Sequence, residues 1–131
     1  MRLDRLLAEI GLDNDRASGV EVAGLTIDSR QVVDGTLFVA IQGSVGHGMD
    51  YIDAAITSGA SAVIYDGWDG PVPNMIPALH IPGLRRQIGR IAHAFYENPC
   101  SGMRVVGVTG TNGKTTTVHF IAQLADQLSL K

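Results

Sequence analysis

The chain has 131 residues, a formal net charge of −3, and 45% hydrophobic against 18% charged residues. This much apolar material is enough for a packed core, so we expect a folded protein rather than a disordered chain. The slightly acidic balance argues against a basic surface for nucleic acid or an anionic membrane. The one cysteine, Cys100, excludes an intrachain disulfide and fits a reducing compartment.

The beginning of the chain does not predict export or membrane insertion. Residues 1–5 place an acid among basic residues, and no long apolar segment follows them. No apolar run approaches the roughly 20 residues that span a bilayer. We therefore expect a cytoplasmic protein. The four histidines show no metal-ligand spacing and no serine lies in a Gly-x-Ser-x-Gly turn, so neither a structural metal site nor a serine hydrolase is predicted.

The first hundred residues alternate between helical and extended patterns. Apolar residues at helical spacing predict a helix over 3–10 that stops at Gly11, and extended segments follow over 20–27, broken at Gly24. The apolar run 36–41 predicts a buried strand. Further along we expect a glycine-rich loop at 43–48, a helix from Tyr51 that ends at Gly59, strands at 62–65 and 78–81, a surface loop at 67–77 and a helix at 84–96. This alternation predicts the α/β class.

Turn residues at 98–102 interrupt the pattern and predict a domain boundary, with one domain over 1–101 and the start of another over 102–131. Beyond the boundary, 104–108 reads as a β-branched strand and 114–128 as a helix. If that strand forms, it has an unpaired edge and an apolar face. It could pack back on the first domain or pair with another copy of the chain, and the sequence does not choose between them.

The segment between this strand and helix has the pattern of a phosphate-binding loop. Gly110 and Gly113 permit the close backbone approach that a phosphate chain needs, and the amides at a helix N-terminus can surround it. Lys114 would reach the β- and γ-phosphates, and the hydroxyl of Thr115 would bind Mg²⁺. The general pattern has its first glycine where this chain has Val108. A plain glycine turn with a solvated lysine is the alternative interpretation.

This loop resembles the ATP-binding loop of the Mur ligases, which ligate amino acids to UDP-linked muramic acid precursors of peptidoglycan. The resemblance rests on Thr109 and on the loop residues Gly110, Thr111, Asn112, Gly113, Lys114, Thr115 and Thr116. An independent similarity comes from 26–30, 35–40 and 47–52, which look like the UDP-binding domain of two members, the tripeptide-forming ligase and the ligase that adds the later dipeptide. Thr111 favours the tripeptide-forming type.

The resemblance implies that 1–101 is a small α/β domain that binds the uridine diphosphate end of UDP-N-acetylmuramoyl-L-alanyl-D-glutamate. The residues at the corresponding positions are Ile27 and Ser29 for uridine, and Ser44, Val45 and Gly46 for the diphosphate. Without the family, residues 28–30 could be a turn with a surface ion pair and 43–48 a flexible connection. His47 belongs to this loop and could also lie near a ligand.

In the family, ATP with Mg²⁺ phosphorylates the substrate carboxylate, and the amine of the incoming amino acid attacks the acyl phosphate. Lys114 and Thr115 are the catalytic residues that this resemblance places in the chain, with Thr115 also the Mg²⁺ ligand. An acidic metal ligand from another strand is missing, because Asp126 is the one acid after the loop and lies on the loop's own helix. We therefore expect an N-terminal fragment, inactive as a ligase. The alternatives are a fragment of the ligase that adds the later dipeptide, a free-standing P-loop protein and a nucleotide-sugar binding module.

Overall fold

The computed structural model describes residues 1–12 and 14–129. The chain divides into two compact units, Met1–Glu97 and Asn98–Lys131. The first unit therefore ends close to the turn-rich segment at 98–102. Which functions the two parts of the chain perform stays a prediction.

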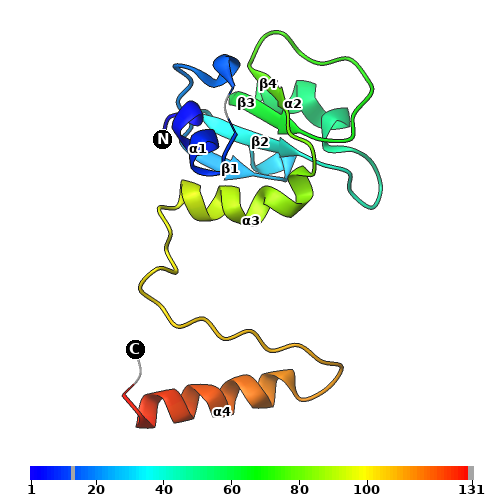
Figure 1. Cartoon of the computed structure of the whole chain (residues 1–131). Helices are drawn as coiled ribbons and strands as arrows, with labels where there is room; N and C mark the ends of the chain where they lie inside the picture. The colour runs from blue at the N-terminus through cyan, green and yellow to red at the C-terminus, as the bar shows by residue number, and fades with distance from the viewer. Residues whose placement is uncertain (13, 130–131) are drawn as a thin grey trace. The chain divides into compact units, whose positions relative to one another are not determined.

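A four-stranded parallel sheet forms the centre of the first unit (Figure 1). Its strands are β1 (Gly24–Thr26), β2 (Thr36–Ala40), β3 (Ala60–Tyr65) and β4 (Ala78–His80), and they lie in that order across the sheet. All five residues of β2 are buried, as its almost wholly apolar sequence predicts for a strand covered on both faces. The α/β class is confirmed.

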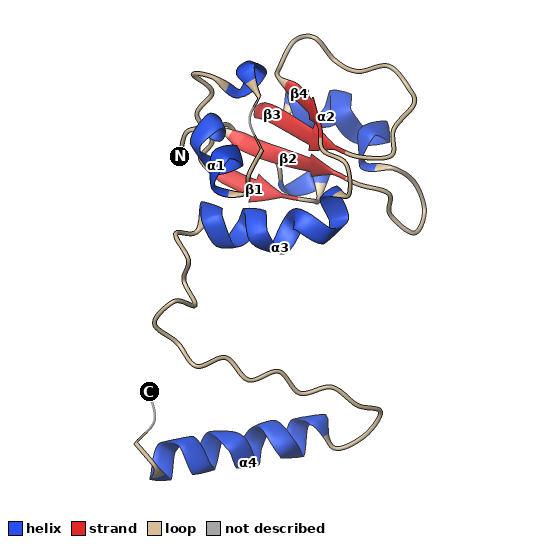
Figure 2. Ribbon diagram, in the orientation of Figure 1, coloured by secondary structure: helices blue, strands red, loops and turns tan. Residues whose placement is uncertain are grey.

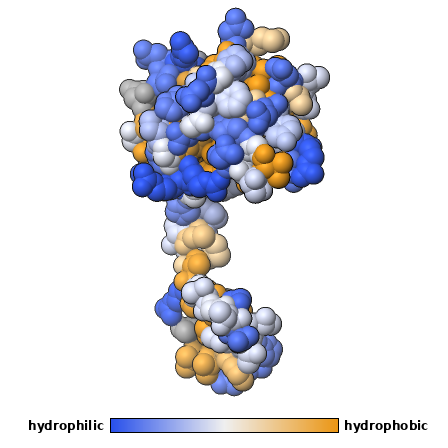
Figure 3. Space-filling model, turned by 90° about the vertical axis from the view of Figure 1, so that its right-hand side faces the viewer, coloured by the Kyte–Doolittle hydropathy of each residue, from blue (hydrophilic) through white to orange (hydrophobic). Residues whose placement is uncertain are grey.

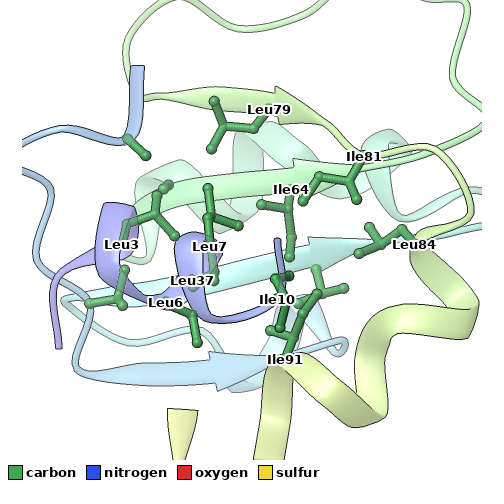
Figure 4. Packing of buried hydrophobic residues seen from close by; sticks show 14 of the residues in the cluster. Leu3, Leu6, Leu7, Ile10, Leu37, Ile64, Leu79, Ile81, Leu84 and Ile91 are labelled. Atoms are coloured by element: carbon green, nitrogen blue, oxygen red, sulfur yellow. The ribbon is translucent and has the colours of Figure 1, made fainter. Parts of the chain in front are cut away.

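Successive side chains of a strand point to opposite faces, so each face of the sheet has its own core. Leu37 and Val39 belong to a cluster that includes residues of α1 (Leu3–Glu9) and α3 (Leu84–Phe95). Figure 4 shows Leu37 among residues of both helices. Phe38 and Ala40 face a second cluster, formed with the 3-10 helix η3 (Gly48–Tyr51) and with α2 (Ile52–Thr57). The unit is a three-layer sandwich with helices on both faces of the sheet.

The predicted helices and buried strands of this unit occur, with differences in detail. Of the extended segments predicted over 20–27, only β1 is a strand, and Gly24 is its first residue and pairs with Thr36 instead of breaking it. The helix predicted from Tyr51 is divided into η3 and α2. A Cβ atom at Gly24 would lie 3.6 Å from the hydroxyl oxygen of Thr36, which is ordinary contact, so no close approach requires glycine there. Two further short 3-10 helices, η1 (Asp15–Ala17) and η2 (Ser29–Gln31), connect the elements.

The second unit contains one regular element, α4 (Lys114–Gln127), within its described residues. The prediction of a strand over 104–108 is wrong, because Figure 2 shows this segment as loop. A β-strand exists only through hydrogen bonds to a neighbouring strand, and the described residues offer none to this segment. Its β-branched composition shows a preference for extended backbone, and Val105 and Val106 remain exposed.

Apolar side chains of α4 are on the surface, as the orange areas of the second unit in Figure 3 show. Phe120, Leu124 and Leu128 are each more than half exposed and recur at intervals of four, which places them on one face of a helix. No residue of α4 is buried. None of the helices in the described ranges is long and apolar enough to cross a membrane.

Candidate functional site

A pocket of about 650 Å³ lies in the first unit, beyond the carboxyl ends of the strands. Open parallel sheets bind ligands at this edge, because the loops that follow the strands meet there. One wall is the segment after β1, another is the segment after β2, and Arg85 comes from the first turn of α3. The lining residues are Ile27, Asp28, Ser29, Arg30, Phe38, Ile41, Gln42, Gly43, Ser44, Gly46, Gly48, Tyr51 and Arg85.

The wall after β1 is fixed by an aspartate that caps η2. The carboxylate of Asp28 accepts hydrogen bonds from the backbone amide of Arg30 at 3.0 Å and from its guanidinium at 2.9 and 2.8 Å. This pairing with Arg30 lowers the pKa of Asp28 to about 2. The turn with a surface ion pair, considered above as an alternative, is therefore present, and it places Ser29 on the pocket wall.

The wall after β2 is a tight glycine turn. The amide of Gly43 donates to the carbonyl of Gly46 at 2.8 Å, and the amide of Gly48 donates to the carbonyl of Ile41 at 2.9 Å. Within the described part of the chain, the amides of Ser44 and Val45 donate no hydrogen bond to protein atoms. Ser44 lines the pocket, so its free backbone amide is a donor that could bind an anion such as a phosphate.

His47 supports this turn from within the protein. Its side chain is buried, with 5% exposed, and its Nδ1 accepts a hydrogen bond from the amide of Met49 at 3.0 Å. Nε2 must then carry the proton, and it donates to the carbonyl of Asp66 at 2.7 Å. Asp50 completes the cap by accepting from the amide of His47 at 2.8 Å. His47 therefore holds the start of η3 in place and is not among the pocket-lining residues.

Asp66, at the end of β3, also fixes the start of α3. Its carboxylate accepts hydrogen bonds from the amides of Gly83 at 2.8 Å and Leu84 at 3.2 Å, and its other oxygen lies 3.4 Å from Nε2 of His80. A carboxylate at a helix N-terminus satisfies amides that have no partner within the helix. The same residue thus anchors His47 and the turn of helix that presents Arg85.

Of the five residues predicted to contact the UDP group, the pocket brings together Ile27, Ser29, Ser44 and Gly46. Val45 is not among the lining residues, and its side chain is 95% exposed. Whether any of them contacts a ligand stays a prediction. Sequence reasoning did not find Arg85. The sequence held one signal for it: a helix that follows a strand of a parallel sheet begins at the sheet edge where the ligand-binding loops lie.

The predicted phosphate loop lies in the second unit, between residues 109 and 117. Gly110 and Gly113 have φ of +152° and +73°, a region that favours glycine, and Gly113 is the N-terminal cap of α4. The side chain of Lys114 donates to the carbonyl of Gly110 and so folds back over the loop. The first helical hydrogen bond at this end comes from the amide of Thr117. Thr111, Asn112, Thr115 and Thr116 are exposed.

These features fit the phosphates of a nucleotide. The first amides of α4 lack helical partners, and Lys114 contributes a cation whose hydrogen-bond partner is a backbone carbonyl. Thr115 can offer Mg²⁺ one hydroxyl oxygen. Within the described residues no group of three or more histidine, cysteine, aspartate or glutamate side chains could hold a metal ion.

Comparison with known proteins gives a family-level match to "Mur ligase family, catalytic domain" over residues 21–96. A UDP-N-acetylmuramoyl-L-alanyl-D-glutamate–2,6-diaminopimelate ligase of Xanthomonas oryzae is 43% identical over 127 residues, which cover 94% of this chain and 24% of that protein. A UDP-N-acetylmuramyl-tripeptide synthetase of a Roseiflexus species is 49% identical over 107 residues, which cover 80% of this chain and 20% of the relative. The chain thus spans about a quarter or less of these relatives' length.

Solved structures agree on the fold. The MurF ligase of Thermotoga maritima in complex with ADP superposes with a TM-score of 0.61 at 29% identity, over 82% of this chain and 24% of that one. A MurF structure from Acinetobacter baumannii gives a TM-score of 0.65 at 23% identity, over 87% of this chain and 24% of that one, and supports the fold alone. The family match covers more than half of the sequence and confirms the resemblance. The chain belongs to the Mur ligase family.

Proposed function

We propose that the first unit binds UDP-N-acetylmuramoyl-L-alanyl-D-glutamate, as the substrate-binding part of a tripeptide-forming Mur ligase. The observation that carries this proposal is the pocket, which gathers Ile27, Ser29, Ser44 and Gly46 from two separate loops at the carboxyl edge of the sheet. Relatives with 38–49% identity are named for ligation to this substrate or for tripeptide synthesis, which supports this precursor over others of the family.

The pocket has the chemistry that a uridine diphosphate group requires. Its volume of about 650 Å³ is that of a small-molecule site. Apolar side chains of Ile27 and Ile41 can cover a base, and the Ser29 hydroxyl can form a hydrogen bond without adding charge. The amide of Ser44, which lines the pocket and donates no hydrogen bond to protein backbone, is available to the diphosphate.

The second part of the proposal concerns ATP. Gly110 to Thr116 would bind the phosphates of MgATP, with Lys114 beside the β- and γ-phosphates and Thr115 on the metal. ATP would supply the phosphoryl group that activates the substrate carboxylate for attack by an amine. The chain spans a quarter of its relatives' length, so we propose this activity for a complete cytoplasmic ligase. By itself the chain would bind the precursor without ligating it.

Calorimetric titration tests the proposal, because the UDP precursor and MgATP can be titrated separately to the pocket and the phosphate loop. We expect saturable binding of the UDP precursor that Ser29→Ala weakens roughly threefold to tenfold, the usual value of one neutral hydrogen bond. Lys114→Ala is the matched control in the phosphate loop and should leave precursor binding unchanged. Tight MgATP binding together with no response to the UDP precursor would contradict the proposal and favour an independent P-loop protein.

A further inference from the structure

We propose that Arg85 binds the diphosphate in this pocket. Its charge then makes the site select nucleoside diphosphates over the nucleoside. This inference rests on the proposed function of the pocket and adds a residue to it. Arg85 lies on α3, outside both loops that the family resemblance pointed to.

The charges that line the pocket identify Arg85. Three of the lining residues are charged, namely Asp28, Arg30 and Arg85. Asp28 and Arg30 pair with each other at 2.8 Å, and each largely neutralises the field of its partner. Arg85 forms no ion pair with any carboxylate in the described ranges. The uncompensated positive charge of the pocket is therefore on the α3 side.

The structure also holds Arg85 in a suitable place. Its guanidinium donates to the carbonyl of Gln42, the residue immediately before the glycine turn whose amides are available to an anion. The backbone that carries it is fixed by the carboxylate of Asp66, which accepts hydrogen bonds from the two preceding amides, those of Gly83 and Leu84. The side chain of Arg85 therefore contacts the loop after β2, and its backbone is held in place by Asp66.

A guanidinium has five N–H donors, and the contact with Gln42 uses one of its two terminal nitrogens. The other donors can form the paired hydrogen bonds that arginine makes with phosphate oxygens. Lysine would retain the charge and lose this paired geometry. The neutral side chains of the pocket, by contrast, have no preference for a doubly charged ligand over uridine.

The test measures the affinity of the 131-residue chain for UDP, UMP and uridine in a buffer without divalent cations. Arg85→Gln should weaken UDP binding roughly tenfold to a hundredfold, since it removes charge-assisted hydrogen bonds, and change uridine binding less than twofold. Arg85→Lys should retain part of the affinity for UDP. Arg90→Gln, on the same helix and exposed but outside the pocket lining, is the matched control and should change neither.

The outcomes separate this inference from the function on which it rests. Equal UDP affinity of the wild type and Arg85→Gln, in a chain that binds the UDP precursor, would overturn the role of Arg85 alone. An equal loss of UDP and uridine would also overturn it, because the arginine would then act through the shape of the pocket. A wild type that binds neither the precursor nor UDP would overturn both.

Discussion

The sequence of the first unit specifies a packed core, whereas the sequence of the second specifies a local motif. The first has a parallel sheet with a separate buried core on each face, and its pocket is built from loops that are 10 or more residues apart in the chain. The second has the more recognisable motif, yet every described residue of α4 is at least partly exposed. A phosphate-loop sequence therefore specifies a local turn and a helix start, whereas a core needs several elements that cover one another.

The contrast also shows where function can be tested in this chain. Residues that are held by burial and by capping hydrogen bonds, such as His47 and Asp66, keep the first pocket in shape. In the second unit Lys114 forms its contact with its own loop. We expect substitutions to affect the two units very differently.

The largest difference should come from matched leucines. Leu37 in β2 is fully buried and Leu124 in α4 is 57% exposed. Leu37→Ala should lower the free energy of unfolding by about 2–5 kcal/mol, because it leaves a cavity in the core, whereas Leu124→Ala should change it by less than about 0.5 kcal/mol. Urea unfolding followed by the fluorescence of Trp68, the chain's one tryptophan, reports on the first unit. Similar losses for both variants would show that the units share a core.

Two glycines with positive φ give a smaller difference. A Cβ at Gly59 (φ +99°) would lie 2.7 Å from the Cα of Asp34, while one at Gly113 (φ +73°) would meet no atom within 4 Å. Gly59→Ala should cost about 3 kcal/mol through backbone strain and overpacking. Gly113→Ala should cost about 1 kcal/mol, confined to the start of α4.

The Trp68 unfolding midpoint in urea checks this pair of variants. It should fall for Gly59→Ala and remain unchanged for Gly113→Ala. A shift of the Trp68 midpoint in Gly113→Ala would contradict the separation of the two units.

The smallest effect concerns pH. The folded protein lowers the pKa of Asp28 from 3.8 to about 2 through its hydrogen bonds with Arg30. Because the pKa of Asp28 is lower in the folded than in the unfolded protein, its ionised form stabilises the fold at pH values above the unfolded-state pKa. This contribution is lost as the pH falls from about 4 towards 2. Wild type should therefore be slightly more stable than Asp28→Asn at pH 6, and the gap should narrow as the pH falls below 4.

Urea midpoints measured between pH 6 and pH 3 check this dependence. Asp126→Asn, in the second unit, should leave the Trp68 midpoint unchanged at every pH. A gap between wild type and Asp28→Asn that is constant with pH would mean that the ion pair with Arg30 contributes nothing to stability.

Much of this structure could be predicted from the sequence, because local patterns determined it. The buried run of β2 and the helices that end near Gly11 and Gly59 needed only periodicity and turn residues. The strand expected at 104–108 failed because pairing is not a local property. Arg85 was missed for a similar reason, since only the order of the strands brings α3 beside the loop that contains Ser44.

A residue-resolved NMR titration tests most directly whether the first unit carries the substrate pocket. The ¹⁵N-labelled chain is titrated with UDP-N-acetylmuramoyl-L-alanyl-D-glutamate and the backbone amide shifts are followed. We expect saturable changes at residues 27–30 and 42–46 and at Arg85, with none over 110–127. Changes confined to 110–116, with the signals of 27–46 unmoved, would contradict it.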